Sequence, residues 1–188
     1  MSTLVFFLEE PSARDALEGL LPRILPDDVR VEYLVFEGKQ DLEKRMAKRM
    51  RGWLEKDSLF VVLRDQDCGD CRVIKRTLQE RCTQAGRPEA LVRIACRQLE
   101  SWFIGDWQAV GEAFDMPNLQ RQRRKAIYRV PDTIGSPVTE LRKFIASYQK
   151  RDGARKIGKR LEIDRNRSRS FQVFVHGLHR LLGREESV

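Results

Sequence analysis

The sequence lacks any long hydrophobic run, and this absence excludes a helix that spans a membrane. No apolar stretch approaches the roughly 20 residues that such a helix needs. The N-terminus has neither a basic segment nor a small-residue cleavage site, and "LEEPS" at residues 8–12 interrupts the first apolar run. We therefore expect no signal peptide and a cytoplasmic location. Repeats and low-complexity tracts are also missing, and 188 residues suit one domain, with or without an appendage.

Cysteine is sparse. Cys68 and Cys71 form a C-x-x-C pair, whereas Cys82 and Cys96 stand alone. A structural zinc site favours a second close pair, which is missing, and a redox C-x-x-C usually lies in a thioredoxin-like context. We interpret the four cysteines as incidental small residues of a protein from a reducing compartment.

Positive charge is concentrated in one part of the chain. Residues 1–120 hold 18 Lys/Arg and 21 Asp/Glu, whereas residues 121–169 hold 16 and 5. This asymmetry favours an anionic partner, and nucleic acid is the first candidate. A solvated basic surface is the alternative interpretation.

Four short apolar runs alternate with four amphipathic segments. The expected strands are residues 3–8, 29–36, 59–64 and 90–96, and the expected helices are residues 9–25, 39–55, 70–86 and 98–114. Within the first helix, Ser12 and Asp15 resemble a capping box. Within the second, Leu42, Met46, Met50 and Leu54 form one apolar stripe.

This alternation predicts an α/β fold with a mostly parallel sheet of about four strands, covered by helices on both faces. From residue 115 the strand signal stops. A basic, irregular connection at 121–137 precedes helical patterns at 138–150, 153–163 and 170–183. We assign residues 1–114 to the α/β core and residues 115–188 to a basic helical subdomain packed on it.

Carboxylates follow three of the four expected strands. Glu9 and Glu10 end the first, Asp65 and Asp67 end the third, and Glu100 comes soon after the fourth. The carboxyl ends of parallel strands meet at one edge of a sheet, where ligands bind. Side chains two apart in an extended chain face the same way, so Asp65 and Asp67 are expected to point together. Oxygen ligands of this kind suit Mg²⁺ or Mn²⁺.

Each carboxylate also has a simpler explanation. An isolated D-x-D is common and also suits a polar turn. Glu9 and Glu100 are equally suited to the first turn of a helix, where the macrodipole favours negative charge. The combination at three strand ends is what favours a metal site.

A strand that ends in Glu9, followed by a strand that ends in Asp65 and Asp67 in "VLRDQD", resembles the Toprim fold of topoisomerases, primases and overcoming-lysogenization-defect nucleases. The resemblance implies that Glu9 acts in acid–base chemistry and that the two aspartates hold magnesium. Many Toprim domains follow this glutamate with glycine. Here Glu10 and Pro11 follow, so Glu9 and Glu10 are both candidates for the catalytic acid.

The sequence is more closely similar to a bacterial Toprim-like family, the domain of unknown function four-two-seven-six. The similar stretches cover nearly the whole chain and are "EEPSARDALEGLLPRILP", "VFEGKQDL", "VVLRDQD", "VRIACRQLESWFIGD", "VPDTIGSP" and "NRSRSFQVFVHGL". The resemblance implies an acidic position at Glu100, as an additional metal ligand. It also implies a nuclease that works beside an ATPase partner in a defence-type system.

Several basic residues are candidates for contacts with a nucleic acid. Lys125 is a candidate for stabilising the charged transition state, although a basic loop explains it equally well. Candidate phosphate-backbone contacts are Arg121, Arg123, Arg124, Arg165, Arg167 and Arg169. Tyr128 and Tyr148 lie among basic residues, as base-stacking side chains do, but a core position is the preferred interpretation.

Two hypotheses follow. The first is a magnesium-dependent phosphoryl-transfer enzyme, a nuclease, that uses Glu9 or Glu10 with Asp65, Asp67 and Glu100. The second is a non-catalytic adaptor that binds nucleic acid or an ATPase through its basic segment. A small-molecule phosphohydrolase is a weaker third interpretation.

Overall fold

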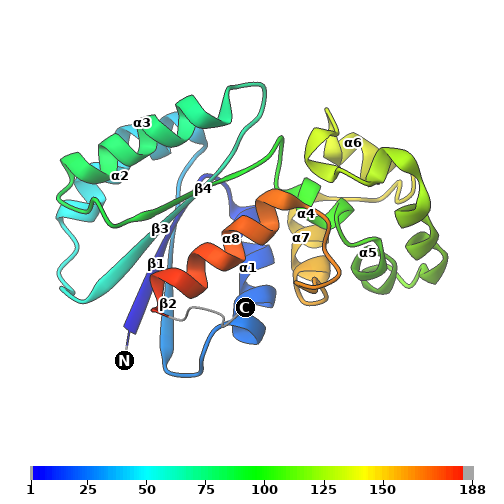
Figure 1. Ribbon diagram of the computed structural model, residues 1–188, viewed down its shortest axis with the longest axis horizontal. Helices are drawn as coiled ribbons and strands as arrows, with labels where there is room; N and C mark the ends of the chain where they lie inside the picture. The colour runs from blue at the N-terminus through cyan, green and yellow to red at the C-terminus, as the bar shows by residue number, and fades with distance from the viewer. Residues whose placement is uncertain (1, 184–188) are drawn as a thin grey trace.

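The protein, described here by a computed structural model over residues 2–183, has an α/β fold (Figure 1). The elements of its first half alternate strictly between strand and helix: β1 (Ser2–Leu8), α1 (Pro11–Ile24), β2 (Val29–Val35), α2 (Lys39–Arg51), β3 (Ser58–Asp65), α3 (Cys71–Gln84) and β4 (Leu91–Ala95). Its second half is helical: α4 (Glu100–Ile104), α5 (Trp107–Ala113), the 3-10 helices η1 (Pro117–Arg124), η2 (Ala126–Tyr128) and η3 (Pro131–Thr133), then α6 (Pro137–Arg142), α7 (Lys150–Gly158) and α8 (Arg169–Leu181). Residues 184–188, which the sequence assigns to the second segment, lie outside the described residues.

The four strands form one parallel sheet in the order β2-β1-β3-β4, as the sequence predicts. The central strands β1 and β3 are buried along almost their whole length, because helices cover both faces. Helices α2 and α3 cover one face, and α1 and α8 cover the other (Figure 1). No helix in residues 2–183 is long and apolar enough to cross a membrane.

The helical second half shares its core with the sheet. One hydrophobic cluster includes Phe6 of β1, Leu17 of α1, Trp102 of α4 and Phe174 of α8. The ring of Trp102 lies 4.9 Å from that of Phe174, centroid to centroid, and its indole N–H donates to Ser170 Oγ. Tyr128 and Tyr148 are buried in the same cluster, which confirms their expected core position.

Helix α7 lies directly against α1. Gly158 approaches so closely that an added Cβ would lie 2.3 Å from the carbonyl oxygen of Ala16. The guanidinium groups of Arg151 and Arg155 reach across the contact to Asp15, at 2.7 and 3.2 Å. The start of α7 is thereby fixed beside the start of α1, where β1 ends.

Two local predictions for the first half were wrong. Ser12 is not an N-cap, because Pro11 occupies the first helical turn and Glu10 is the N-cap residue. Leu54 does not extend the apolar stripe of α2. The helix ends at Arg51, so Leu54 is 94% exposed while Met46 and Met50 are fully buried.

The helices expected at 98–114 and 138–150 are both interrupted. The first is divided into two separate helices, α4 and α5. Asp106 is the N-cap of α5, and the preceding Gly105 lies in close contact with Asn166. In place of the second, only the short helix α6 forms. The last two helices begin earlier than expected, at Lys150 and Arg169.

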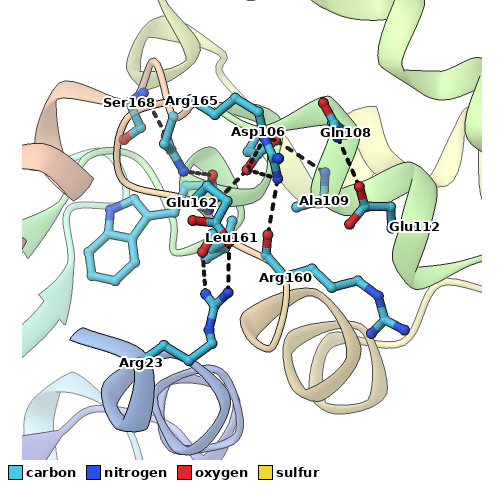
Figure 2. Close-up of polar contacts among 12 residues, drawn as sticks. Arg23, Asp106, Gln108, Ala109, Glu112, Arg160, Leu161, Glu162, Arg165 and Ser168 are labelled. Carbon is cyan, nitrogen blue, oxygen red and sulfur yellow. Dashed lines mark hydrogen bonds and ion pairs between the residues drawn. The ribbon is translucent and has the colours of Figure 1, made fainter. Parts of the chain in front are cut away.

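Asp106 is the centre of a polar cluster that joins the start of α5 to the segment between α7 and α8 (Figure 2). Its carboxylate accepts hydrogen bonds from the backbone N–H groups of Ala109 and Glu162, and it pairs with the guanidinium of Arg165 at 3.0 Å. From α1, Arg23 reaches the carbonyl of Leu161 and the carboxylate of Glu162. A buried charge with this many donors stabilises the connection that leads into α8.

We expect Gly158→Ala to destabilise the protein by about 1–3 kcal/mol, because the new methyl group overpacks the contact between α7 and α1. Chemical denaturation followed by circular dichroism measures this difference. Gly135→Ala is the matched control, since nothing lies within 4 Å of its added Cβ. Equal unfolding free energies for the two variants would contradict the close approach.

Candidate acidic site at the carboxyl edge of the sheet

The strand order places the site. From β1 the chain moves to β2 on one side of the sheet and then to β3 on the other, so the order reverses between β1 and β3. The crevice at such a reversal is where open α/β sheets bind ligands, beyond the carboxyl ends of the strands. Glu9 follows the end of β1, and Asp65 is the last residue of β3.

Glu9 and Asp65 are in direct contact at this crevice. The backbone N–H of Asp65 donates to Glu9 Oε2 at 3.1 Å, and Arg64 Nε lies 3.8 Å from the same oxygen. Asp65 Oδ1 accepts the backbone N–H of Leu99 at 2.9 Å, which ties β3 to the start of α4. Both carboxylate residues are only 8% exposed.

Glu100 completes the deepest part of the site. It is fully buried in the first turn of α4, and its Oε1 accepts a hydrogen bond from the hydroxyl of Tyr148 at 3.3 Å. Its other carboxylate oxygen, Oε2, has no hydrogen-bond partner in the described part of the chain. A buried carboxylate oxygen without a donor is costly, so its presence requires a reason.

One ammonium group offsets part of this negative charge. Lys150, at the start of α7, donates to both carboxylate oxygens of Glu10, at 2.9 and 2.7 Å. Its charge also acts on Glu100 and Asp65. The hydroxyl of Ser12 donates to Glu10 Oε2 at 3.2 Å. The positive charge from α7 therefore pairs with a carboxylate that follows β1 and acts electrostatically on those that end β3 and begin α4.

The pKa shifts reflect this crowding. Burial, followed by the charges of Glu100, Glu10 and Glu9, raises the pKa of Asp65 well above its usual value. Burial also raises the pKa values of Glu9 and Glu100. For Lys150, burial opposes the charged form, but the bond to Glu10 and the neighbouring carboxylates outweigh it and raise the pKa. All four shifts show an excess of negative charge with too little solvent to screen it.

Asp67 lies outside the strand that ends at Asp65. Strand β3 ends at Asp65, and Asp67 adopts the left-handed conformation, with φ 53°. The alternation that predicts a common direction therefore does not extend to it. Its carboxylate pairs with Lys39 at 3.1 Å on a more exposed surface, although its charge still acts on Glu9.

The donor set fits a divalent cation in its chemistry. Asp65, Glu10 and Glu100 offer only oxygen atoms, one of them unpartnered, and Mg²⁺ typically takes one or two carboxylates with water and phosphate oxygens. Across residues 2–183, however, no group of three or more His, Cys, Asp or Glu side chains is arranged to enclose a metal ion. The Lys150 ammonium pairs with one of the three, Glu10, instead.

The candidate basic residues fall into two groups. Arg121, Arg123, Arg124, Arg167 and Arg169 are exposed. Arg165 is largely occupied by its pair with Asp106 (Figure 2), and Lys125 lies over the ring of Phe144 at 5.5 Å. Within the described residues, Lys125 has no hydrogen bond or ion pair to the carboxylates at the sheet edge.

Lys150 is the site residue that sequence reasoning missed. It is one of 16 Lys/Arg residues between positions 121 and 169, and nothing local distinguishes it. Its partner Glu10 lies 140 positions away, so only the packing of α7 on α1 brings the two together. The contact of Ser12 with Glu10 was also missed, because the expected capping box assigned the Ser12 hydroxyl to the start of the helix.

Comparison with protein families gives one match, which covers residues 8–179 and is described as "Domain of unknown function (DUF4276)". The chain belongs to this family. Comparison with curated proteins and with solved structures gave no match. The DUF4276 region extends from the end of β1 to α8, so it includes every carboxylate of the acidic site as well as Lys150.

The raised pKa of Asp65 predicts a pH-dependent stability difference between the wild type and Asp65→Asn in EDTA. When the native pKa of a carboxyl group is raised, its protonated form stabilises the fold. This contribution is complete below the ordinary pKa of about 4 and is lost as pH rises through the native pKa. The asparagine side chain does not ionise, so the variant does not lose this stability as pH rises. We therefore expect Asp65→Asn to be the more stable protein at pH 7, by about 1.4 kcal/mol for each unit of pKa elevation.

Asp41→Asn is a control of opposite sign. The backbone N–H of Glu37, followed by Arg45, lowers the pKa of Asp41. Its contribution is therefore present above the ordinary value and lost as pH falls, so this variant is expected to be the less stable protein at pH 7. Denaturant titrations from pH 4 to pH 8 measure both differences. A wild type more stable than Asp65→Asn at pH 7 would contradict the account of the acidic site.

Proposed function

We propose that this DUF4276 protein is a divalent-metal-dependent phosphoryl-transfer enzyme that cleaves nucleic acid. The observation that carries the proposal is the group of buried carboxylates at the β1/β3 crevice, with one oxygen of Glu100 unpartnered. Elsewhere a buried carboxylate such as Asp106 is well matched, by Arg165 and two backbone donors. At the crevice the fold buries more negative charge than it neutralises, as functional sites often do.

The proposed roles follow from position. Asp65, Glu10 and Glu100 hold the cation, because they already share the positive charge of Lys150. A bound Mg²⁺ or Mn²⁺ supplies Lewis-acid chemistry at a phosphodiester. Glu9 is the proton carrier, since burial raises its pKa toward the working range of a general acid or base. Asp67 is more exposed than Asp65 and pairs with Lys39, so it takes no ligand position in this proposal.

The resemblance to Toprim domains supports the same assignment, since it places an acid–base glutamate after the first strand and metal-binding aspartates after the third. The structure departs from that pattern at Asp67, which lies beyond the end of β3 in the left-handed conformation and pairs with Lys39. Glu10 and Glu100 therefore take the second and third ligand positions in this proposal.

Exposed arginines on η1 supply the contact with nucleic acid. Arg121, Arg123 and Arg124 lie on one short 3-10 helix whose buried residue is Leu119. Such contacts position a phosphate backbone without reading its sequence.

A non-catalytic binding module is the second candidate. One observation favours it: Lys150 already pairs with Glu10, so this part of the acidic site is neutralised without a metal. In this case the basic segment binds nucleic acid, or an ATPase partner binds the chain, and no turnover occurs.

Isothermal titration calorimetry with MgCl₂ and MnCl₂ tests the enzymatic proposal. We expect the wild type to bind either ion and Asp65→Asn to bind at least tenfold more weakly, because a charged ligand is replaced by a neutral one. Cleavage of single- and double-stranded DNA and RNA, assayed on the same samples, is expected to fall at least 100-fold.

Asp152→Asn is the matched control, because it removes one aspartate charge from a surface pair with Lys156. It is expected to bind and cleave as the wild type does. A wild type that binds neither ion, even with nucleic acid present, would contradict the proposal. Metal binding without cleavage of any substrate would favour the non-catalytic module.

The proposed role of η1 predicts a change in salt dependence. For Arg121→Gln/Arg124→Gln we expect weaker nucleic-acid binding, and a slope of log K against log [NaCl] that is smaller by about one for each arginine–phosphate pair that the substitutions remove. Fluorescence anisotropy at several salt concentrations measures this slope. Arg72→Gln/Arg76→Gln on α3 removes the same charge from other exposed positions. An equal weakening in both double variants would show a general charge effect and contradict a contact specific to η1.

A further inference from the structure

The two edges of the sheet differ in how far they are protected. At β4, the outward carbonyl of Ala90 accepts from Gln79, and that of Val92 accepts from the guanidinium of Arg93. The outward N–H of Cys96 donates to Ser170 Oγ at the start of α8. Four of the five β4 residues are buried. This edge is partly covered by side chains and by α8, one of the ways in which proteins protect edge strands.

The β2 edge is open. The backbone N–H of Phe36 donates to Leu8 of β1, so the even-numbered residues of β2 face β1 and the odd-numbered residues face outward. Within the described residues, no hydrogen bond reaches the outward backbone groups of Val31, Tyr33 or Val35. None of the seven residues of β2 is buried, although "VRVEYLV" is rich in strand-forming side chains.

The sequence of this edge is complementary to itself. In an antiparallel pair of β2 strands centred on Val31, Arg30 of each copy lies opposite Glu32 of the other, and Val29 lies opposite Tyr33. The outward backbone N–H and C=O groups of the two Val31 residues then form a hydrogen-bonded pair at the axis. Shifts of the centre by one residue place Arg30 opposite Arg30, or Glu32 opposite Glu32, and like charges directly opposite are destabilising.

The charged side chains of β2 are partly exposed and have partners only at the surface of their own chain. Arg30 pairs with Glu55 at 2.9 Å, whereas Glu32 has only a loose ion pair, 3.6 Å from Arg30. A second copy would bring its Glu32 beside Arg30 as a further partner. On the α1 face, Val29, Val31 and Tyr33 line a cavity of about 320 Å³ whose other wall is the end of α1 and the turn that follows it. A second copy would place its own apolar side chains of β2 beside the mouth of this cavity.

We propose that two copies of this chain pair through β2, antiparallel and centred on Val31, to form a continuous eight-stranded sheet. The two-fold axis passes between the two Val31 residues, so the interface uses the same surface twice, as cyclic dimers do. The acidic sites lie at the carboxyl ends of β1 and β3 in each copy, and the antiparallel arrangement points them in opposite directions along the sheet.

Sedimentation velocity of the full chain, across a hundredfold range of concentration, tests the proposal. The wild type is expected to sediment as a dimer of the 22.0 kDa chain. Arg30→Glu places like charges opposite each other at both symmetric positions, and we expect it to weaken the dimer at least tenfold. The swap Arg30→Glu/Glu32→Arg restores opposite charges across the axis and is expected to recover most of the dimer affinity.

Val31→Pro removes an outward N–H that the monomer leaves unpaired, so the fold is expected to persist while the dimer dissociates. Val31→Thr, which keeps that N–H, is the control, and circular dichroism checks the fold of each variant. A wild type that is monomeric throughout would overturn the proposal. So would a dimer that Arg30→Glu and Val31→Pro leave intact, because it would use another surface. Neither result depends on metal binding or cleavage.

Discussion

The rest of the structure depends on one electrostatic constraint, the negative charge buried where β1 and β3 end. Glu9, Asp65 and Glu100 are almost or fully buried, and Glu10 stands beside them with Lys150 as its counter-ion. Burial disfavours the charged forms of Glu9, Asp65 and Glu100, and neighbouring carboxylates add to this effect. The fold tolerates this arrangement because backbone donors, Tyr148 and Lys150 hold it in place. Such a cost is typical of a site kept for binding or chemistry rather than for stability.

The architecture explains how distant residues meet there. The reversal of strand order opens the crevice between β1 and β3, and the chain after β4 returns to it as α4, which carries Glu100. The close contact of Gly158 with α1 then brings the start of α7, and with it Lys150, to the same place. The helical second half therefore completes the site as well as the core, which agrees with a family match that spans both halves.

The sheet could be predicted from sequence because parallel strands covered on both faces must be continuously apolar, and four such runs alternate with helical patterns. The site was only partly predictable. Glu9, Asp65 and Glu100 follow strand ends, but the direction of Asp67 depends on a single left-handed residue, which a spacing rule cannot detect. Lys150 depends on tertiary packing alone. The error at Leu54 has a similar origin, since an apolar stripe does not show where a helix ends.

The central claim is that the strand-end carboxylates form a cation site, and anomalous diffraction from crystals grown with MnCl₂ tests it most directly. The account predicts one anomalous peak bounded by Asp65, Glu10 and Glu100, with the Lys150 ammonium moved away from its present position and Glu100 Oε2 no longer unpartnered. Manganese bound only elsewhere, or Lys150 still paired with Glu10 at saturating manganese, would contradict it. The carboxylates would then be a neutralised structural cluster, and the function of the protein would lie in its surfaces.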